Sequence, residues 1–266
     1  MPDRDQPFDP RLVLLRRGRA APGARDAFYL HRRAADELLD RLALVARPFA
    51  TALDLSAHPA VAEGLRARGI AVTVAGETEL PSIRGPFDLV ASLGLLDTVN
   101  DVPGALALIR RALKPDGLFL AAFAGAGSLP RLRRAMRAGE EAEGTGAAPR
   151  IHPQIDVRAA GDLLVRAGFA LPVVDRDVVE VLYPSLDRLV ADLRAMGATN
   201  SLARRSRRPL TRIGLAAAAA DFGTETLERF EIVYLSGWAP APGQPAPARR
   251  GSGTASLAAA LKPRPR

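Results

Sequence analysis

The first half of the chain alternates short apolar runs with segments in which apolar residues recur at helical spacing. The run at 51–55 is followed by a turn at 56–59 and by a helical pattern that stops at Gly69, in the order strand, turn, helix. Such alternation is typical of a parallel sheet with helices on both faces. The pattern predicts strands at 51–55, 70–74, 87–93 and 118–123, and helices at 25–46, 60–68 and 103–113.

The second half predicts more helix and closes on a segment rich in Pro and Gly. Helices are expected at 128–138, 157–167 and 186–196, a loop at 139–149, and strands at 172–182 and 230–238. We therefore expect three parts: an N-terminal arm at 1–24, one α/β domain at 25–239 that includes a helical lid at about 183–222, and a flexible Pro/Gly/Arg-rich tail at 240–266.

Composition narrows the class of protein. The 266 residues contain no cysteine, which excludes a disulfide scaffold, a thiolate metal site and a cysteine nucleophile. No apolar run approaches the roughly 20 residues of a membrane-spanning helix. The net charge of +8 comes almost entirely from arginine, and without interleaved aromatic residues it does not favour nucleic acid. We expect a cytoplasmic bacterial protein, with peripheral contact to the inner face of the membrane left open.

The turn after the first predicted strand carries the candidate ligand site. In a parallel sheet, ligands bind beyond the carboxyl ends of the strands. Here the strand ends in Asp54, followed by Ser56, His58 and Ala60 at alternate positions. This segment resembles the first motif of the class I S-adenosylmethionine-dependent methyltransferases, D-x-G-x-G-x-G, with side chains in place of all three glycines. Those side chains are expected to fill space that glycine leaves open to a ligand.

A second passage resembles the same class more closely. Phe87 to Leu93, then Asp97 to Asp101, then Lys114-Pro115-Asp116-Gly117 follow the order of its fourth and fifth strands, and Gly117 is expected to take the left-handed step of a turn. The resemblance implies a Rossmann-like, mostly parallel sheet with an antiparallel last strand, and S-adenosylmethionine as cofactor. The cofactor-binding positions that it implies are Asp54, Ser56, His58, Glu77, Ser92 and Leu93.

The C-terminal half resembles the respiratory complex I assembly factors of methyltransferase fold. The similarity lies in Ile151-His152-Pro153, in Tyr183-Pro184 with 189–200, and in the tail segment 249–257. It implies action on a protein substrate, in particular a complex I subunit, by methyl transfer or arginine hydroxylation, with Tyr183 and Asn200 as substrate contacts. A runner-up resemblance is to the malonyl-carrier-protein methyltransferases of biotin synthesis. A third alternative is a pseudoenzyme that kept the fold and works as an assembly chaperone.

Other chemistries find little support in the sequence. His31, His58 and His152 are far apart in the chain and lie in different predicted elements, so we expect no metal site. The chain has no Gly-x-Ser-x-Gly nucleophile elbow and no Gly-x-x-x-x-Gly-Lys phosphate loop. The candidate chemistry is therefore that of the methyltransferase class, acting through the first turn of the sheet.

Overall fold

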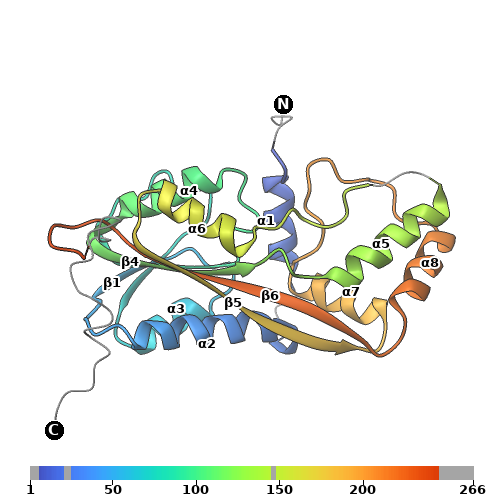
Figure 1. Ribbon diagram of the computed structural model, residues 1–266, viewed down its shortest axis with the longest axis horizontal. Coiled ribbons are helices and arrows are strands. Elements are labelled where there is room, and N and C mark those ends of the chain that lie inside the picture. The colour runs from blue at the N-terminus through green and yellow to red at the C-terminus, as the bar shows by residue number, and fades with distance from the viewer. Residues whose placement is uncertain (1–5, 21–24, 145–147, 246–266) are drawn as a thin grey trace, which may run out of the picture.

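The sheet has six strands in the order β2-β1-β3-β4-β6-β5. The structure, a computed structural model, describes residues 6–20, 25–144 and 148–245. Strands β1 to β4 run parallel, and β6 lies antiparallel between β4 and β5, which confirms the mostly parallel sheet with an antiparallel last strand (Figure 1). The strands are β1 (Thr51–Asp54), β2 (Ala71–Val74), β3 (Phe87–Leu93), β4 (Leu113–Ala124), β5 (Ala170–Tyr183) and β6 (Thr226–Trp238).

Helices cover both faces of the sheet, as the alternation predicts. On one face, α4 (Val102–Ala112) and α6 (Val157–Arg166) pack with β3, β4 and β6 around Phe119 and Ile109. On the other face, α2 (Tyr29–Ala43), preceded by the 3-10 helix η1 (Arg25–Phe28), packs with α3 (Ala60–Ala67) around Leu65 (Figure 1). The near-continuous apolar runs of β3 and β4 follow from this double coverage.

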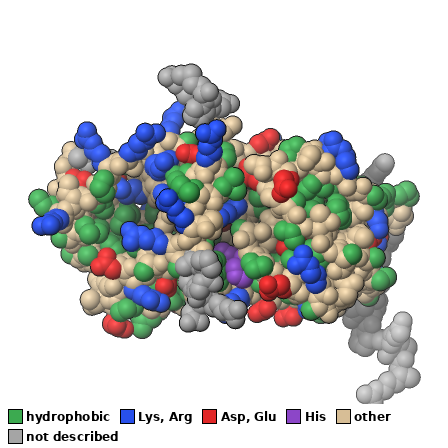
Figure 2. All heavy atoms as spheres, turned by 180° about the vertical axis from the view of Figure 1, so that it is seen from behind, with side chains coloured by type: hydrophobic (Ala, Val, Ile, Leu, Met, Phe, Trp, Pro, Cys, Tyr) green, Lys and Arg blue, Asp and Glu red, His purple; other side chains and the backbone are tan. Residues whose placement is uncertain are grey.

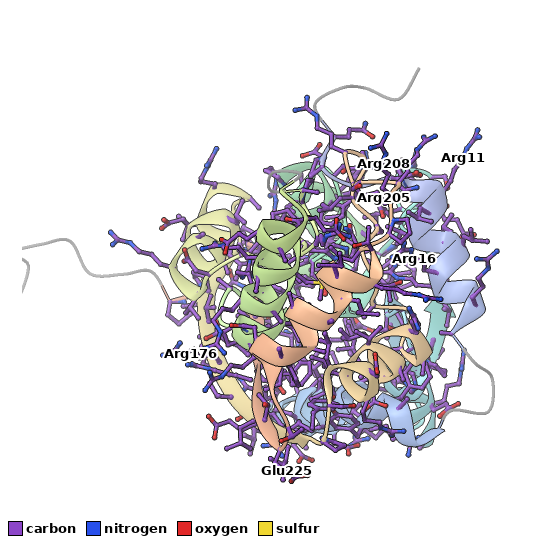
Figure 3. All side chains as sticks on the ribbon, turned by 90° about the vertical axis from the view of Figure 1, so that its right-hand side faces the viewer. Arg11, Arg16, Arg176, Arg205, Arg208 and Glu225 are labelled. Atoms are coloured by element: carbon purple, nitrogen blue, oxygen red, sulfur yellow. The ribbon has the colours of Figure 1, made fainter. Side chains whose placement is uncertain are left out.

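A third apolar cluster lies around the segment 183–222, in which a helical lid is expected, and the helices of this cluster are called the lid below. It joins α5 (Pro130–Glu143), α7 (Leu186–Ala195) and α8 (Arg212–Phe222) with the end of β5 and the beginning of β6, and Leu189 and Ala218 are fully buried in it. The helix α1 (Pro10–Arg19) lies against the end of α7, where the backbone of Arg16 approaches Gly197. Arg16 of α1 lies close to Arg205, in the segment that precedes α8 (Figure 3).

Several predicted boundaries were wrong. The loop expected at 139–149 begins later, because α5 continues to Glu143, with Gly139 packed closely against Gly214 of α8. The last strand begins at Thr226 rather than at 230, since its first residues pair with the end of β5. No separate helix was predicted at α1, which lies within the expected arm, or at α8, an alanine-rich helix with weak periodicity that lies within the expected helical lid. The tail segment 249–257 lies outside the described residues.

The Lys-Pro-Asp-Gly segment is an irregular beginning of β4 rather than a free turn. Asp116, not Gly117, takes the left-handed conformation, with φ of 60°. The backbone N–H of Asp116 donates to the carbonyl of Ala239, and the N–H of Ala239 donates to the carbonyl of Gly117. Pairing with the end of β6 therefore decides the local conformation. No helix in the described part of the chain is long and apolar enough to cross a bilayer.

Candidate functional site

A cavity of about 910 Å³ lies between the carboxyl ends of the central strands and the lid. Its wall combines the turn after β1, the end of β3, helix α1 and the segment that follows α7. Figure 2 shows histidine near the middle of one face of the molecule, among hydrophobic, basic and acidic side chains. The wall includes Arg17, Phe28, His31, His58, Gly94 and Asn200. A cavity at this edge of a doubly covered sheet is the expected ligand position of the fold.

Asp54 and Ser56 hold the turn after β1 to the neighbouring strand. Asp54 is buried, and its Oδ1 accepts a hydrogen bond of 3.0 Å from the backbone N–H of Ser56. The hydroxyl oxygen of Ser56 accepts from the N–H of Leu93, at 3.0 Å. Burial raises the pKa of Asp54, and the hydrogen bonds from Ser56 oppose that shift. Both side chains therefore fix the turn in place, and Leu93 is the one of these three residues on the cavity wall.

His58 fills the turn with an aromatic ring. Its Nδ1 accepts from the backbone N–H of Ala60 at the start of α3, at 3.2 Å. The ring lies 4.8 Å from that of Phe28 and 5.6 Å from that of His31, measured between centroids. Bare glycine backbone, which the first motif of the class uses for close approach to a ligand, is therefore replaced by a packed cluster of three rings.

His31 completes this cluster from α2. Its Nδ1 is buried and has no hydrogen-bond partner among the described residues. Burial, with smaller contributions from His58 and Arg17, lowers the pKa of His31 from 6.5 to about 4. The pKa of His58 is also lowered, first by burial and then by Arg32. Both imidazoles are neutral at pH 7, so each offers one donor and one acceptor nitrogen.

The backbone that a ligand can approach closely lies at Gly94, not in the turn after β1. This glycine follows β3, has φ of +71°, and meets no side chain closer than the Ala57 methyl, at 3.8 Å from an added Cβ. Arg17 of α1 reaches across the cavity wall to it, donating to the Gly94 carbonyl and, at 2.7 Å, to the hydroxyl of Thr98. The residues present therefore fit a ligand beside Gly94, with a guanidinium available to an anionic group.

The other predicted residues lie in different surroundings. Ser92 is buried within β3, and its hydroxyl has no partner among the described residues. Glu77 is half-buried after β2 and does not line the cavity; burial raises its pKa and Arg17 opposes that shift. Tyr183 is 2% exposed, and its hydroxyl lies 2.8 Å from that of Tyr29, away from the cavity wall. Asn200 lines the cavity and donates to the carbonyl of Pro149.

Sequence reasoning missed three polar residues of the wall. Arg17 reaches the site from α1 through its hydrogen bonds to Gly94 and Thr98, and nothing in the local sequence signals that contact. Asp97 entered the sequence analysis only as the first residue of a segment that resembles the methyltransferase class, yet its Oδ1 is buried without a partner among the described residues. His152 accepts at Nε2 from the N–H of Ser201, at 2.9 Å. His152 was named in the Ile-His-Pro segment of the sequence, but its place on the cavity wall was not predicted.

The three histidines do not form one cluster. His31 and His58 come together, whereas His152 lies elsewhere on the cavity wall, edge-on to the ring of Phe8. Across residues 6–20, 25–144 and 148–245 no group of three or more His, Asp or Glu side chains is arranged to hold a metal ion. The chemistry of the wall is that of arginine, neutral imidazole and carboxylate groups.

Comparison with known proteins places the chain in a family. Residues 37–121 match the model of a methyltransferase domain. The "Arginine-hydroxylase NDUFAF5, mitochondrial" of Homo sapiens is 33% identical over 260 residues, which cover 86% of this chain and 75% of that protein. The chain belongs to the NDUFAF5 family. The matched domain supports S-adenosylmethionine as the cofactor, and the fold is that of the class I methyltransferases.

Two further relatives show how far the similarity reaches. The NDUFAF5 protein of Danio rerio is 39% identical over 192 residues, covering 70% of this chain and 60% of that protein. The "Malonyl-[acyl-carrier protein] O-methyltransferase" of Xylella fastidiosa (strain M23) is 36% identical over 169 residues, covering 60% and 55%. The chain thus spans about three fifths of the zebrafish relative and three quarters of the human one.

Proposed function

We propose that this member of the NDUFAF5 family binds S-adenosylmethionine in the cavity and modifies an arginine side chain of a protein substrate during assembly of respiratory complex I. The observation that carries the proposal is one continuous cavity of about 910 Å³, walled on one side by the sheet and on the other by the lid. Ligand cavities in proteins run from about 300 to 1,000 Å³, so this one is large enough for a cofactor and a substrate side chain together.

The residues that would hold the cofactor are those at the open part of the sheet edge. Ala57 and His58 lie on the β1 side, Leu93 and Gly94 on the β3 side, and Arg17 supplies a positive charge for a carboxylate. When bound, S-adenosylmethionine supplies an electrophilic methyl group. The wall of the lid, with Asn200, would orient the substrate side chain and exclude water.

Ligand binding is tested by thermal unfolding of the full chain with S-adenosylhomocysteine. A ligand that binds only the folded state stabilises it by mass action, by about 2.7 kcal/mol when it is present at 100 times its dissociation constant. We expect a clear rise in melting temperature in the wild type. An unchanged melting temperature at millimolar ligand would refute the cofactor part of the proposal.

The reaction is tested on complex I from cells with and without the gene. Mass spectrometry of its subunits distinguishes an arginine that gains one oxygen atom, which indicates hydroxylation with an external oxidant such as dioxygen, from one that gains a CH₂ unit, which indicates methyl transfer from S-adenosylmethionine. Identical arginine masses in the two strains would refute the enzymatic proposal.

The ring cluster favours a second candidate, a binding protein that keeps the fold without turnover. His58 lies in the turn where close backbone approach is expected, and Phe28 and His31 pack against its ring. Under this alternative, S-adenosylhomocysteine causes no shift, and the complex I intermediate still co-purifies with the chain. The variant His58→Gly with Ala60→Gly tests the cause of that loss, because it restores ligand binding only if side-chain bulk is the obstacle.

A further inference from the structure

The second half of strand β5 is an uncovered edge of the sheet. β5 is the last strand in the order, and among the described residues it pairs with β6 alone. It is 14 residues long, whereas natural proteins keep edge strands short or cover them, because the free N–H and C=O groups are a template for another strand. The free edge of β5 can therefore pair with a strand of another molecule.

One face of the β5–β6 strand pair is also exposed. Val179, Val181 and Tyr183 point to the side where α2 and the lid pack, and they contribute to those apolar clusters. Alternate residues point to the opposite side. There, Val178 is 39% exposed and Leu182 53% exposed, and Leu227 of β6, which is paired with Leu182, is 54% exposed. The helix α6 covers this side only near the beginning of β5, at Val174.

The charges of β5 fit a second copy of the same strand. When two β5 strands pair antiparallel around Val178, Arg176 of each copy faces Glu180 of the other, and Val174 faces Leu182. A shift of the centre to Arg176 or Glu180 would instead bring identical charges face to face, which is destabilising. The register around Val178 is thus favoured by both charge and apolar contact.

The side chains of Arg176 and Glu180 are exposed enough to meet a second copy. Arg176 is bonded to the buried Glu231 at 2.8 Å, yet its side chain is 54% exposed and points outward from β5 (Figure 3). Glu180 is exposed and has no ion pair among the described residues. The acids at 175 and 177 are bonded to Arg41 and Arg33 of α2 on the other face, so they do not repel an approaching strand.

We propose that the chain forms a homodimer in which the β5 strands of two copies pair antiparallel around Val178, so that their two sheets join into one. The dimer brings Val178 against Val178 and Leu182 against Val174 of the other copy, and it forms two Arg176–Glu180 ion pairs between the copies. It is independent of the chemistry in the cavity, because β5 between residues 176 and 182 contributes nothing to the cavity wall.

Two charge reversals test the pairing. In the Glu180→Arg variant, Arg176 of each copy faces a second arginine, and in the Arg176→Glu variant, Glu180 of each copy faces a second glutamate. Each variant alone is expected to raise the dimer dissociation constant at least about tenfold, since like charges placed face to face oppose association. In an equimolar mixture of the two variants, the copy that carries Glu180→Arg presents two arginines to the two glutamates of the copy that carries Arg176→Glu, so the heterodimer restores both ion pairs and is expected to form where neither variant dimerises alone. The double variant Arg176→Glu with Glu180→Arg restores both pairs with their direction exchanged, and it is expected to dimerise like the wild type.

The measurement is sedimentation velocity of the full chain at micromolar concentration, with circular dichroism to confirm that each variant is folded. Glu141→Arg, an exposed charge reversal of the same kind on α5, is the matched control and keeps the wild-type dimer. A monomeric wild type overturns the proposal. So does a dimer that survives both single reversals, or a folded double variant that stays monomeric.

Discussion

The neutral imidazole of His31 makes the stability of the protein depend on pH in a defined direction. Its pKa is about 4 in the folded state, mainly because it is buried, and about 6.5 in an unfolded chain. A group whose pKa is lower in the folded state favours folding while it is neutral. Its contribution is therefore fully present above pH 6.5 and is lost as the pH falls from 6.5 toward 4.

The size of the effect follows from these two values. Between pH 7.5 and pH 5, protonation of His31 in the unfolded chain removes about 2 kcal/mol from the free energy of unfolding. For a domain of this size, that loss lowers the melting temperature by about 4–8 °C. The carboxylates with lowered pKa do not contribute here, because that of Asp88 titrates near 2.

The assay compares urea unfolding of the wild type and of His31→Phe at the two pH values. The phenyl ring keeps the contacts with Phe28 and His58 but does not titrate. His58 and His152, whose pKa values are also lowered, remain in both proteins, so the difference between their pH dependences isolates His31. If the variant loses as much free energy between pH 7.5 and pH 5 as the wild type, the buried neutral imidazole is not the cause.

Three further predictions concern the framework of the site. Burial raises the pKa of Asp88, but hydrogen bonds from Lys114 and Thr51 outweigh burial and lower the pKa to about 2. The ionised carboxylate therefore stabilises the fold above pH 3.8, and this contribution is lost as the pH falls toward 2. Asp88→Asn should lower the free energy of unfolding by about 2 kcal/mol at pH 7, and an unchanged urea midpoint would contradict this. Glu228 is buried, and its carboxylate accepts hydrogen bonds from the N–H groups of Arg131 and Leu132 at the start of α5. Glu228→Gln should therefore lower the free energy of unfolding by about 1–3 kcal/mol. Thermal unfolding compares it with the exposed control Glu141→Gln, and equal melting temperatures of the two variants would refute this. Arg17→Met removes both hydrogen bonds that fasten α1 to the end of β3, and hydrogen exchange at 10–19 should become faster by about tenfold or more; unaltered exchange would show that α1 is held by other contacts.

Local sequence patterns predicted most of the helices and strands. The apolar run of β3 was predicted with its bounds unchanged, and α4, α6 and α7 each end within about a residue or two of the expected position. The helices α4, α6 and α7 begin with a side-chain cap, from Asp101, Asp156 and Ser185, and such caps are visible in the sequence. The irregular start of β4 escaped prediction because its conformation depends on pairing with Ala239, more than a hundred residues away.

The order of strands and helices, the methyltransferase class and the absence of glycine in the first turn are properties of the sequence itself, because they depend on local periodicity and on residue identity. The tertiary structure alone decided what surrounds that turn. It brought Phe28 and His31 against His58, placed Arg17 at Gly94, and left Tyr183 bonded to Tyr29 away from the cavity. These contacts join residues that are distant in the chain, and their burial and charge exist only once the sheet, α1 and the lid have packed together.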